Sequence, residues 1–154
     1  MEDLIELLKV RNRTISTCES FTGGLFAALL TEVPGASSVF KGSVVSYANE
    51  IKIRVVNVPP ELIETYGSVS EETASAMAKN TWQLMKSDYC ISFTGNAGPS
   101  ALEGKIAGSV YMAIYGATAT RVYHDTLPGD RHEVRNRSVE LGIIRLTEFI
   151  RDFG

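Results

Sequence analysis

The sequence predicts a single α/β domain, spanning residues 1–154, in which a mixed β-sheet is flanked by helices. Short β-like runs alternate with longer helical segments, which is typical of layered α/β domains. The length of 154 residues is common for one compact domain. No internal repeat, low-complexity tract or linker rich in Pro, Gly and Ser divides the chain. We therefore expect one layered domain.

The first segment, from Leu4 to Val10, has apolar residues at helical spacing with charges between them, which predicts a helix that covers the core. A membrane-surface helix is the alternative, but the polar face is acidic rather than basic. Further helices are predicted at residues 22–31, 60–66, 71–85 and 130–149. Strands are predicted at residues 14–18, 42–47, 89–94, 108–115 and 118–126.

Local signals support two of these helices. Ser70 is a suitable N-cap for the helix at residues 71–85, and Glu71 and Glu72 in its first turn complement the helix dipole. In the last helix, apolar residues recur at steps of four, three and four, which predicts one face packed on the sheet: Val139, Ile143, Leu146 and Ile150.

The connection between the last two strands is short. Gly116-Ala117 lies between alternating flanks, which indicates an antiparallel hairpin and therefore a mixed sheet. The longest irregular stretch is residues 95–107, and loops of that length in compact domains are often functional.

Composition narrows the classes of protein. Hydrophobic residues make up 44% and charged residues 21%, as in ordinary globular domains. Cys18 and Cys90 each lie in an apolar run, so we expect two unpaired, buried thiols, typical of a reducing cytoplasm. No apolar run approaches the roughly 20 residues that cross a bilayer, and the first residues lack the features of a secretory signal. With a net charge of −3 and no basic run, neither membrane nor general nucleic-acid binding is expected.

The strongest local signal for chemistry is the segment from Cys18 to Gly24, where a β-run passes into a helix. A serine at such a turn, here Ser20, can expose its hydroxyl above the sheet, while free amides at the helix start face the same space. This arrangement suits a nucleophile with an oxyanion site. The alternative is structural: Ser20 or Thr22 caps the helix, and Gly23-Gly24 lets it pack closely.

A serine hydroxyl needs a base, and histidine is the usual one. His124 lies at the end of a predicted strand and His132 in a charged helix start, so neither has a recognisable triad context. A serine–lysine pair is the other known solution, provided that burial or positive neighbours lower the pKa of the lysine from about 10.4.

Lys52 is the candidate for that lysine. It follows the strand-end Tyr47 by one helical turn, and if Asn49 caps a short helix, Tyr47 and Lys52 both lean over the carboxyl edge of the sheet. The alternatives are a solvated surface lysine or a salt bridge with Glu50.

Two further segments are candidates for binding. Residues 93–99 end a hydrophobic strand in a loop of small residues, where Thr94 adds a hydroxyl and Gly95 permits close approach of a ligand; an ordinary Gly-Pro turn is the alternative. Arg131 and Arg135, four residues apart at a helix start, can clamp a phosphate. Equally, they can pair with Asp130, Glu133 or a neighbouring subunit.

Taken in order, these segments resemble the C-terminal domain of the competence/damage-inducible protein CinA family, also found as stand-alone nicotinamide-nucleotide amidases. The resemblance covers about residues 4–150. It is carried by the elements CESFTGG, VSYANEIK, GSVSEETA, FTGNAGP, AGSVY and GDR. The larger N-terminal domain of full-length CinA proteins has no counterpart in the sequence, so its pyrophosphatase activity is not expected here.

The resemblance implies that the carboxamide of nicotinamide mononucleotide is hydrolysed to the carboxylate with release of ammonia, without a metal or cofactor. In this family, Ser20 matches the proposed nucleophile, Tyr47 and Lys52 the residues proposed to manage its proton, and Thr94 a residue of the substrate pocket. The expected reaction is acyl transfer through a serine acyl-enzyme. The substrate-binding candidates are Thr22, Gly23, Gly24, Thr94, Gly95, Arg131 and Arg135.

We expect the partners to be a nucleotide substrate and further copies of the chain, in the cytoplasm. Amides near Gly23-Gly24 or Gly95 are candidate oxyanion donors, and Arg131 or Arg135 would hold the phosphate. Phe21 and residues 100–105 depart from the family pattern beside the presumed pocket, which leaves substrate choice open. The rival functions are a catalytically silent nucleotide-binding or interaction module, linked to competence or DNA damage, and an amidase for another small carboxamide.

Overall fold

The computed structural model describes residues 1–154 as one α/β domain with a five-stranded sheet in the order β2-β1-β3-β4-β5. β1 and β2 are parallel, as are β1 and β3, whereas β3, β4 and β5 form an antiparallel series. The expected mixed sheet is therefore confirmed. The strands are β1 (Ile15–Glu19), β2 (Phe40–Val45), β3 (Tyr89–Gly95), β4 (Ser109–Gly116) and β5 (Thr120–Thr126).

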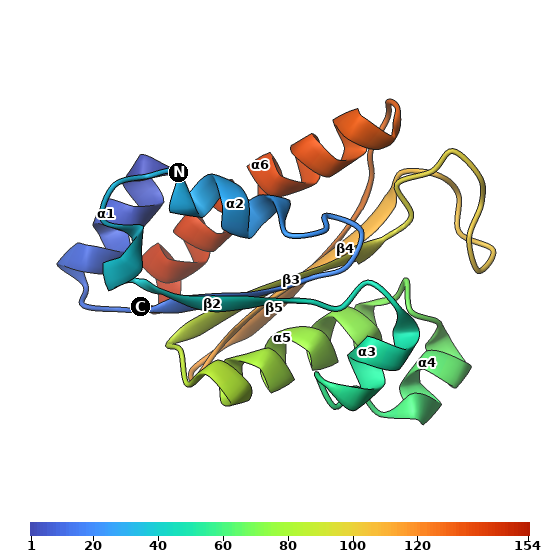
Figure 1. The fold of residues 1–154 in the computed structure, drawn as a ribbon, viewed down its shortest axis with the longest axis horizontal. Helices are drawn as coiled ribbons and strands as arrows, with labels where there is room; N and C mark the ends of the chain where they lie inside the picture. Colours follow the sequence, from blue (N-terminus) through green and yellow to red (C-terminus); the bar gives the residue numbers. More distant parts are fainter.

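Helices cover both faces of the sheet, so the domain has three layers (Figure 1). One face carries α1 (Glu2–Val10), α2 (Leu25–Thr31) and α6 (Arg131–Phe153). The other carries α3 (Asn49–Arg54), α4 (Pro60–Tyr66) and α5 (Glu71–Met85). A short 3-10 helix, Ala36–Ser38, precedes β2.

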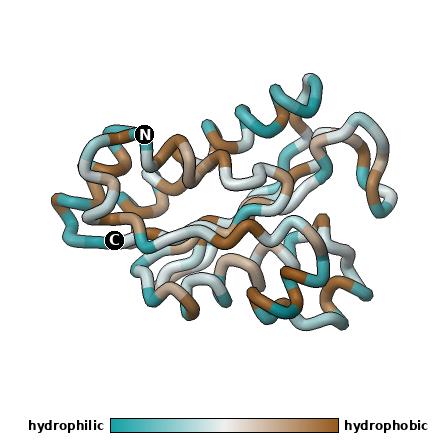
Figure 2. The backbone as a smooth tube through the Cα atoms, viewed as in Figure 1, coloured by the Kyte–Doolittle hydropathy of each residue, from teal (hydrophilic) through white to brown (hydrophobic).

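The main core lies between the sheet and the layer of α1, α2 and α6. Phe26 of α2 and Phe93 of β3 meet there with ring centroids 5.5 Å apart. Gly142 lets α6 approach closely, because an added Cβ would lie 2.6 Å from the Phe93 ring. The first turns of α6 are hydrophilic, whereas hydrophobic residues are frequent in α1 and α2 (Figure 2).

Most predicted elements are present. The bounds of α4 and α5 agree with prediction, and the Ser70 hydroxyl accepts a hydrogen bond from the Thr73 N–H as an N-cap. Of the expected inward face of α6, Val139, Leu146 and Ile150 are buried, and Ile143 is partly buried. Cys18 and Cys90 are buried and unpaired, as expected.

Several boundaries differ from prediction. Each strand differs by one or two residues at one or both ends, and β2 most of all, since it spans Phe40–Val45 instead of residues 42–47. α2 begins at Leu25 rather than at residue 22, because Gly23 and Gly24 have φ of 62° and 94°, which continue the turn instead of the helix. The hairpin connection is residues 117–119 rather than Gly116-Ala117. α6 continues to Phe153, because its apolar face continues through Ile150. Asn49 is the first residue of α3 and makes no side-chain cap; the N-cap is Ala48.

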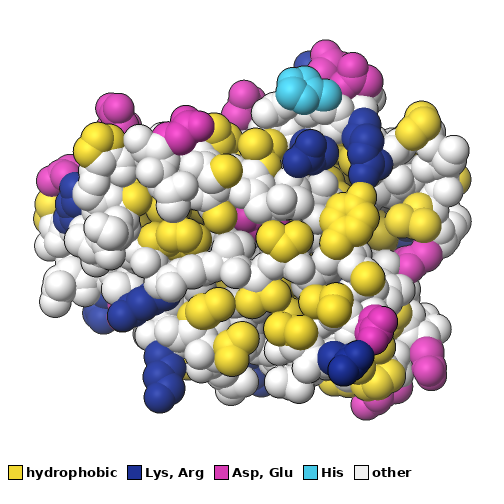
Figure 3. All heavy atoms as spheres, in the orientation of Figure 1, with side chains coloured by type: hydrophobic (Ala, Val, Ile, Leu, Met, Phe, Trp, Pro, Cys, Tyr) yellow, Lys and Arg dark blue, Asp and Glu magenta, His cyan; other side chains and the backbone are white.

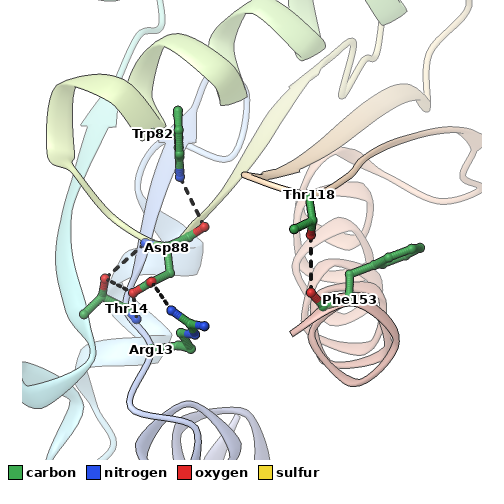
Figure 4. Close-up of polar contacts among 6 residues, drawn as sticks. All are labelled: Arg13, Thr14, Trp82, Asp88, Thr118 and Phe153. Carbon is green, nitrogen blue, oxygen red and sulfur yellow. Dashed lines mark hydrogen bonds and ion pairs between the residues drawn. The ribbon is translucent and has the colours of Figure 1, made fainter.

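Asp88 ties together the beginnings of β1 and β3, at the opposite edge of the sheet from their carboxyl ends (Figure 4). Its carboxylate accepts hydrogen bonds from the Thr14 N–H and hydroxyl, both at 2.8 Å, and from Arg13 at 2.9 Å. The indole N–H of Trp82 donates to the Asp88 carbonyl.

No helix in the structure has the length and apolar character needed to cross a membrane.

Candidate active site

A cavity of about 210 Å³ lies at the carboxyl ends of β1 and β3. Parallel strands bring their carboxyl ends to one edge of the sheet, so residues distant in sequence meet there. The residues that line the cavity include Ser20, Tyr47, Lys52, Thr94, Glu103 and Arg131. A larger hollow of about 530 Å³, near the start of α1 and the end of α2, has no nucleophile paired with a base.

Ser20 and Lys52 are hydrogen-bonded inside this cavity. The distance from Lys52 Nζ to Ser20 Oγ is 2.9 Å, and the two side chains come from elements 32 residues apart. Lys52 is 1% exposed, and Ser20 is 7% exposed. The Lys52 amine also donates to the carbonyls of Ser46, at 2.8 Å, and Tyr47, at 3.3 Å. Neither the solvated lysine nor the Glu50 salt bridge considered from the sequence is present, since Glu50 pairs with Arg54.

Burial lowers the pKa of Lys52 to about 8. The negative charge of Glu103 opposes this shift, but no carboxylate lies within ion-pair distance of the amine. A neutral amine has two N–H groups and one lone pair. Two carbonyls and one hydroxyl surround Lys52, so the neutral form can donate to both carbonyls and accept the Ser20 proton. The geometry suits a lysine that acts as a base.

The turn that carries Ser20 is held by backbone contacts. The Ser20 N–H donates to the Phe93 carbonyl at 2.9 Å, and the Gly23 N–H donates to the Ser20 carbonyl at 3.0 Å. The guanidinium of Arg135 donates to the Thr22 carbonyl at 2.8 Å. Thr22, Gly23 and Arg135 therefore shape the turn, and neither they nor Gly24 are among the residues that line the cavity.

Glu19 is a structural part of the site that sequence reasoning missed. Its fully buried carboxylate accepts hydrogen bonds from the N–H groups of Phe26 and Ala27, each at 3.0 Å. The expectation that the amides at the start of α2 are free is therefore wrong, because Glu19 caps that helix. The neighbouring turn signal at Ser20 and Gly23-Gly24 was visible in the sequence, but the partners of the carboxylate were not.

Amides outside α2 also belong to residues that line the cavity. The N–H groups of Phe21 and Ala97 have no hydrogen-bond acceptor within the protein, and both residues line the cavity. Gly95 also lines it; its N–H lies on the β1 side of β3, because the neighbouring Asn96 N–H donates to the Ser109 carbonyl of β4 and successive residues of a strand bond to opposite neighbours. Phe21 and Ala97 thus join Gly95 as candidate oxyanion donors, whereas Gly23 and Gly24 do not line the cavity.

Tyr47 and Thr94 do not contact the Ser20–Lys52 pair through their hydroxyls. Tyr47 is 58% exposed, and its hydroxyl accepts a hydrogen bond from Arg131 at 2.7 Å, whereas its backbone carbonyl contacts Lys52. The buried Thr94 hydroxyl donates to the Ser68 carbonyl at 2.6 Å. Arg131 also donates to the Gly98 carbonyl at 2.9 Å, so it bridges two loops at the mouth of the cavity.

Glu103 is the second residue that sequence reasoning missed. Its carboxylate accepts hydrogen bonds from the Ser68 hydroxyl at 2.6 Å and the Val69 N–H at 3.1 Å. Partial burial alone would raise the pKa of Glu103, but these hydrogen bonds and the charge of Lys52 more than offset it and lower the pKa. The sequence pointed to this loop through its length, as part of the irregular stretch 95–107, and through the departure of residues 100–105 from the family pattern, but not to Glu103 itself.

Basic side chains gather beside a histidine near the start of α6 on the face shown in Figure 3. Arg131, His132 and Arg135 all belong to the first turns of that helix. Asp130 caps it, accepting from the Glu133 N–H, and the Glu133 carboxylate accepts from the Asp130 N–H.

No group of three or more His, Cys, Asp or Glu side chains is placed to hold a metal ion.

Fold and site together define an α/β domain with a buried serine–lysine pair at the carboxyl edge of its parallel strands. The sequence matches the CinA C-terminal domain over residues 1–150, and the chain belongs to that family. It is 47% identical over 139 residues to a competence-damage inducible protein of Geobacillus sp. strain WCH70, covering 90% of this chain and 33% of the relative. A relative of the same name from Bacillus cereus strain G9842 is 46% identical, with 92% and 35% covered. The chain thus spans about a third of the length of these relatives.

Solved structures with the same fold are also similar over almost the whole chain. The competence or damage-inducible protein of Enterobacter asburiae is 27% identical with a TM-score of 0.94, covering 97% of this chain and 94% of that one. A competence/damage inducible protein of Agrobacterium tumefaciens is 30% identical with a TM-score of 0.91, covering 94% and 90%. The names of these proteins refer to competence and damage and state no reaction.

Proposed function

We propose that this domain is an amidase that hydrolyses the carboxamide of nicotinamide mononucleotide to the carboxylate. The observation that supports it most directly is the 2.9 Å contact between Lys52 Nζ and Ser20 Oγ in a buried cavity, where the pKa of Lys52 is lowered to about 8. A lysine that is partly neutral near pH 8 can accept the proton of a serine nucleophile.

In the first half of the proposed reaction, Ser20 Oγ attacks the carboxamide carbon, and its proton passes to Lys52 Nζ. We assign the tetrahedral oxyanion to backbone amides of the lining residues Phe21, Gly95 and Ala97. Lys52 then returns the proton to the amide nitrogen, the C–N bond breaks, and ammonia leaves an ester on Ser20.

In the second half, water attacks this ester and gives a proton to Lys52. The ester bond to Ser20 breaks, Lys52 returns the proton to Ser20 Oγ, and the carboxylate product leaves. Tyr47 supports the amine through its carbonyl in both halves. Its hydroxyl lies at the rim and accepts a hydrogen bond from Arg131, so the carbonyl rather than the hydroxyl carries the role that we assign to Tyr47.

The size of the cavity suggests how the rest of the nucleotide lies. About 210 Å³ is smaller than the usual ligand pocket of roughly 300–1,000 Å³, so the cavity suits the nicotinamide ring rather than the whole nucleotide. The ribose and phosphate would extend over the rim, where Arg131 is exposed. We therefore assign the phosphate to Arg131 and a supporting role on the Ser20 turn to Arg135.

The test is to incubate the purified domain with nicotinamide mononucleotide and measure ammonia, with nicotinamide riboside and free nicotinamide as alternative carboxamides. Ammonia release that requires Ser20 is the expected result. Binding of the nucleotide by calorimetry without ammonia release would instead support a silent binding module. Turnover of another carboxamide only would keep the amidase mechanism and change the substrate.

A further inference from the structure

Glu103 occupies an unusual position in the cavity, because it is the one acidic side chain among the residues that line it. It belongs to the loop between β3 and β4, which extends beyond one end of the sheet and curls toward the helices of the other layer (Figure 1). Its hydrogen bonds to Ser68 and Val69 hold the carboxylate against the segment between α4 and α5. Glu103 is an exposed residue, and these two hydrogen bonds orient its carboxylate.

Three charged side chains line the cavity. Lys52 lies inside, Arg131 lies at the mouth, and Glu103 is close enough to Lys52 that each shifts the pKa of the other. When Lys52 is neutral, Glu103 and Arg131 are the only charged side chains that line the cavity. A carboxylate has about four acceptor sites, so the contacts with Ser68 and Val69 leave Glu103 able to interact with a ligand.

A ligand that complements Glu103 and Arg131 has a positive charge inside the cavity and a negative charge at the mouth. The substrate of the proposed function has this pattern, since its carboxamide is carried on a cationic pyridinium ring and its phosphate is anionic. The aromatic rings of Phe21 and Tyr47 also line the cavity, and aromatic faces attract cations. A neutral ring offers Glu103 no positive charge to attract.

We propose that Glu103 is a specificity-determining residue that selects carboxamides on a cationic ring over those on a neutral ring. This inference rests on the proposed function and deepens it. Glu103 acts on ring charge and takes no proton from the reaction. A fixed carboxylate within several ångströms of a cationic ring, in a partly solvated cavity, changes affinity by about five- to tenfold.

The experiment compares nicotinamide mononucleotide with its reduced dihydro form, which has the same carboxamide, ribose and phosphate on an uncharged ring. The measured quantity is the ratio of kcat/KM for the cationic substrate to kcat/KM for the neutral one. Glu103→Gln keeps the size of the side chain and removes its charge. We expect the ratio to fall about five- to tenfold, mainly through a higher KM for the cationic substrate.

Two control variants separate charge from loop position. Ser68→Ala keeps the charge of the carboxylate but removes one of the hydrogen bonds that hold it, so it should lower the ratio less than Glu103→Gln does. Glu61→Gln removes an exposed charge on α4, outside the cavity, and should leave kcat/KM unchanged for both substrates. An unchanged ratio in Glu103→Gln, an equal loss for both substrates, or an equal shift in Ser68→Ala would overturn the inference.

Failure of the proposed function would give a different result. If the wild-type domain releases ammonia from neither nucleotide, the dissociation constants of the same two nucleotides are measured by calorimetry for the wild type and Glu103→Gln. A preference for the cationic form that Glu103→Gln removes supports the role of Glu103 independently of catalysis. Equal binding of both forms by the wild type overturns it.

Discussion

The amine of Lys52 lies 2.9 Å from the hydroxyl oxygen of Ser20, and both residues are buried at the carboxyl end of β1. The other two contacts of the amine are backbone carbonyls, and no carboxylate forms an ion pair with it. This arrangement costs stability while Lys52 is protonated and prepares it to lose a proton. The first three predictions test this pair.

Ser20→Ala should reduce ammonia release by at least about a thousandfold, because no other hydroxyl contacts the Lys52 amine. The thermal midpoint should change little, since the variant loses one hydrogen bond, worth about 1 kcal/mol, and Lys52 keeps its two carbonyl partners. Hydroxylamine added to the wild type should trap the acyl group as a hydroxamate. Near-normal turnover by the variant would exclude Ser20 as the nucleophile.

Activity should rise with pH through a limb near pH 8, because Lys52 must be neutral to accept the Ser20 proton. Lys52→Met should abolish the activity, and with it the rise of activity near pH 8. Lys52→Arg keeps the charge but does not lose a proton near neutral pH, so it should be as inactive as Lys52→Met. Substantial activity in Lys52→Arg with the same limb would refute the role of Lys52 as a base.

The stability of the wild type should also depend on pH through Lys52. The pKa of Lys52 is lowered by burial from 10.5 to about 8. Between these values the unfolded state binds more protons, so the free energy of unfolding should rise with pH, by up to about 3 kcal/mol from pH 8 to pH 10.5. Urea denaturation across this range should show the rise in the wild type and not in Lys52→Met. The same slope in both proteins would contradict the assignment.

Glu19→Gln should lower the free energy of unfolding by about 1 to 3 kcal/mol, because the buried carboxylate accepts from two amides at the start of α2. Activity should fall as well, since Glu19 precedes Ser20 and anchors its turn to that helix. Glu32→Gln, at the exposed C-cap of α2, is the matched control and should behave like the wild type. Equal urea midpoints for the two variants would argue against the cap.

Asp88→Asn should lower stability by about 1 to 2 kcal/mol without changing kcat, because Asp88 lies at the opposite edge of the sheet from the cavity. Partial burial favours a raised pKa, but hydrogen bonds from Thr14 and Arg13 outweigh it and lower the pKa. The carboxylate therefore contributes stability above its unfolded pKa of about 3.9, and this contribution is lost as pH falls through the lower folded value. The difference between wild type and variant should shrink in acid, and a constant difference would contradict this account.

Much of the fold was predictable from the sequence alone, because helices and strands impose periodic patterns on neighbouring residues. The Ser70 cap and the apolar face of α6 are local signals, and the structure confirms both. The resemblance of the segments around Ser20 and Lys52 to one family also marked the candidate site. The start of α2 was misplaced because the positive φ of Gly23 and Gly24 is a conformation that glycine permits but does not require.

The tertiary structure alone decided which side chains meet. The contact between Ser20 and Lys52 spans 32 residues, that between Arg135 and Thr22 spans 113, and that between Glu103 and Ser68 spans 35. Such contacts depend on strand order and loop path, which leave no periodic trace in the sequence. Composition and spacing therefore identified the groups capable of chemistry, whereas packing determined which lysine is buried, which arginine reaches the cavity and which carboxylate lines it.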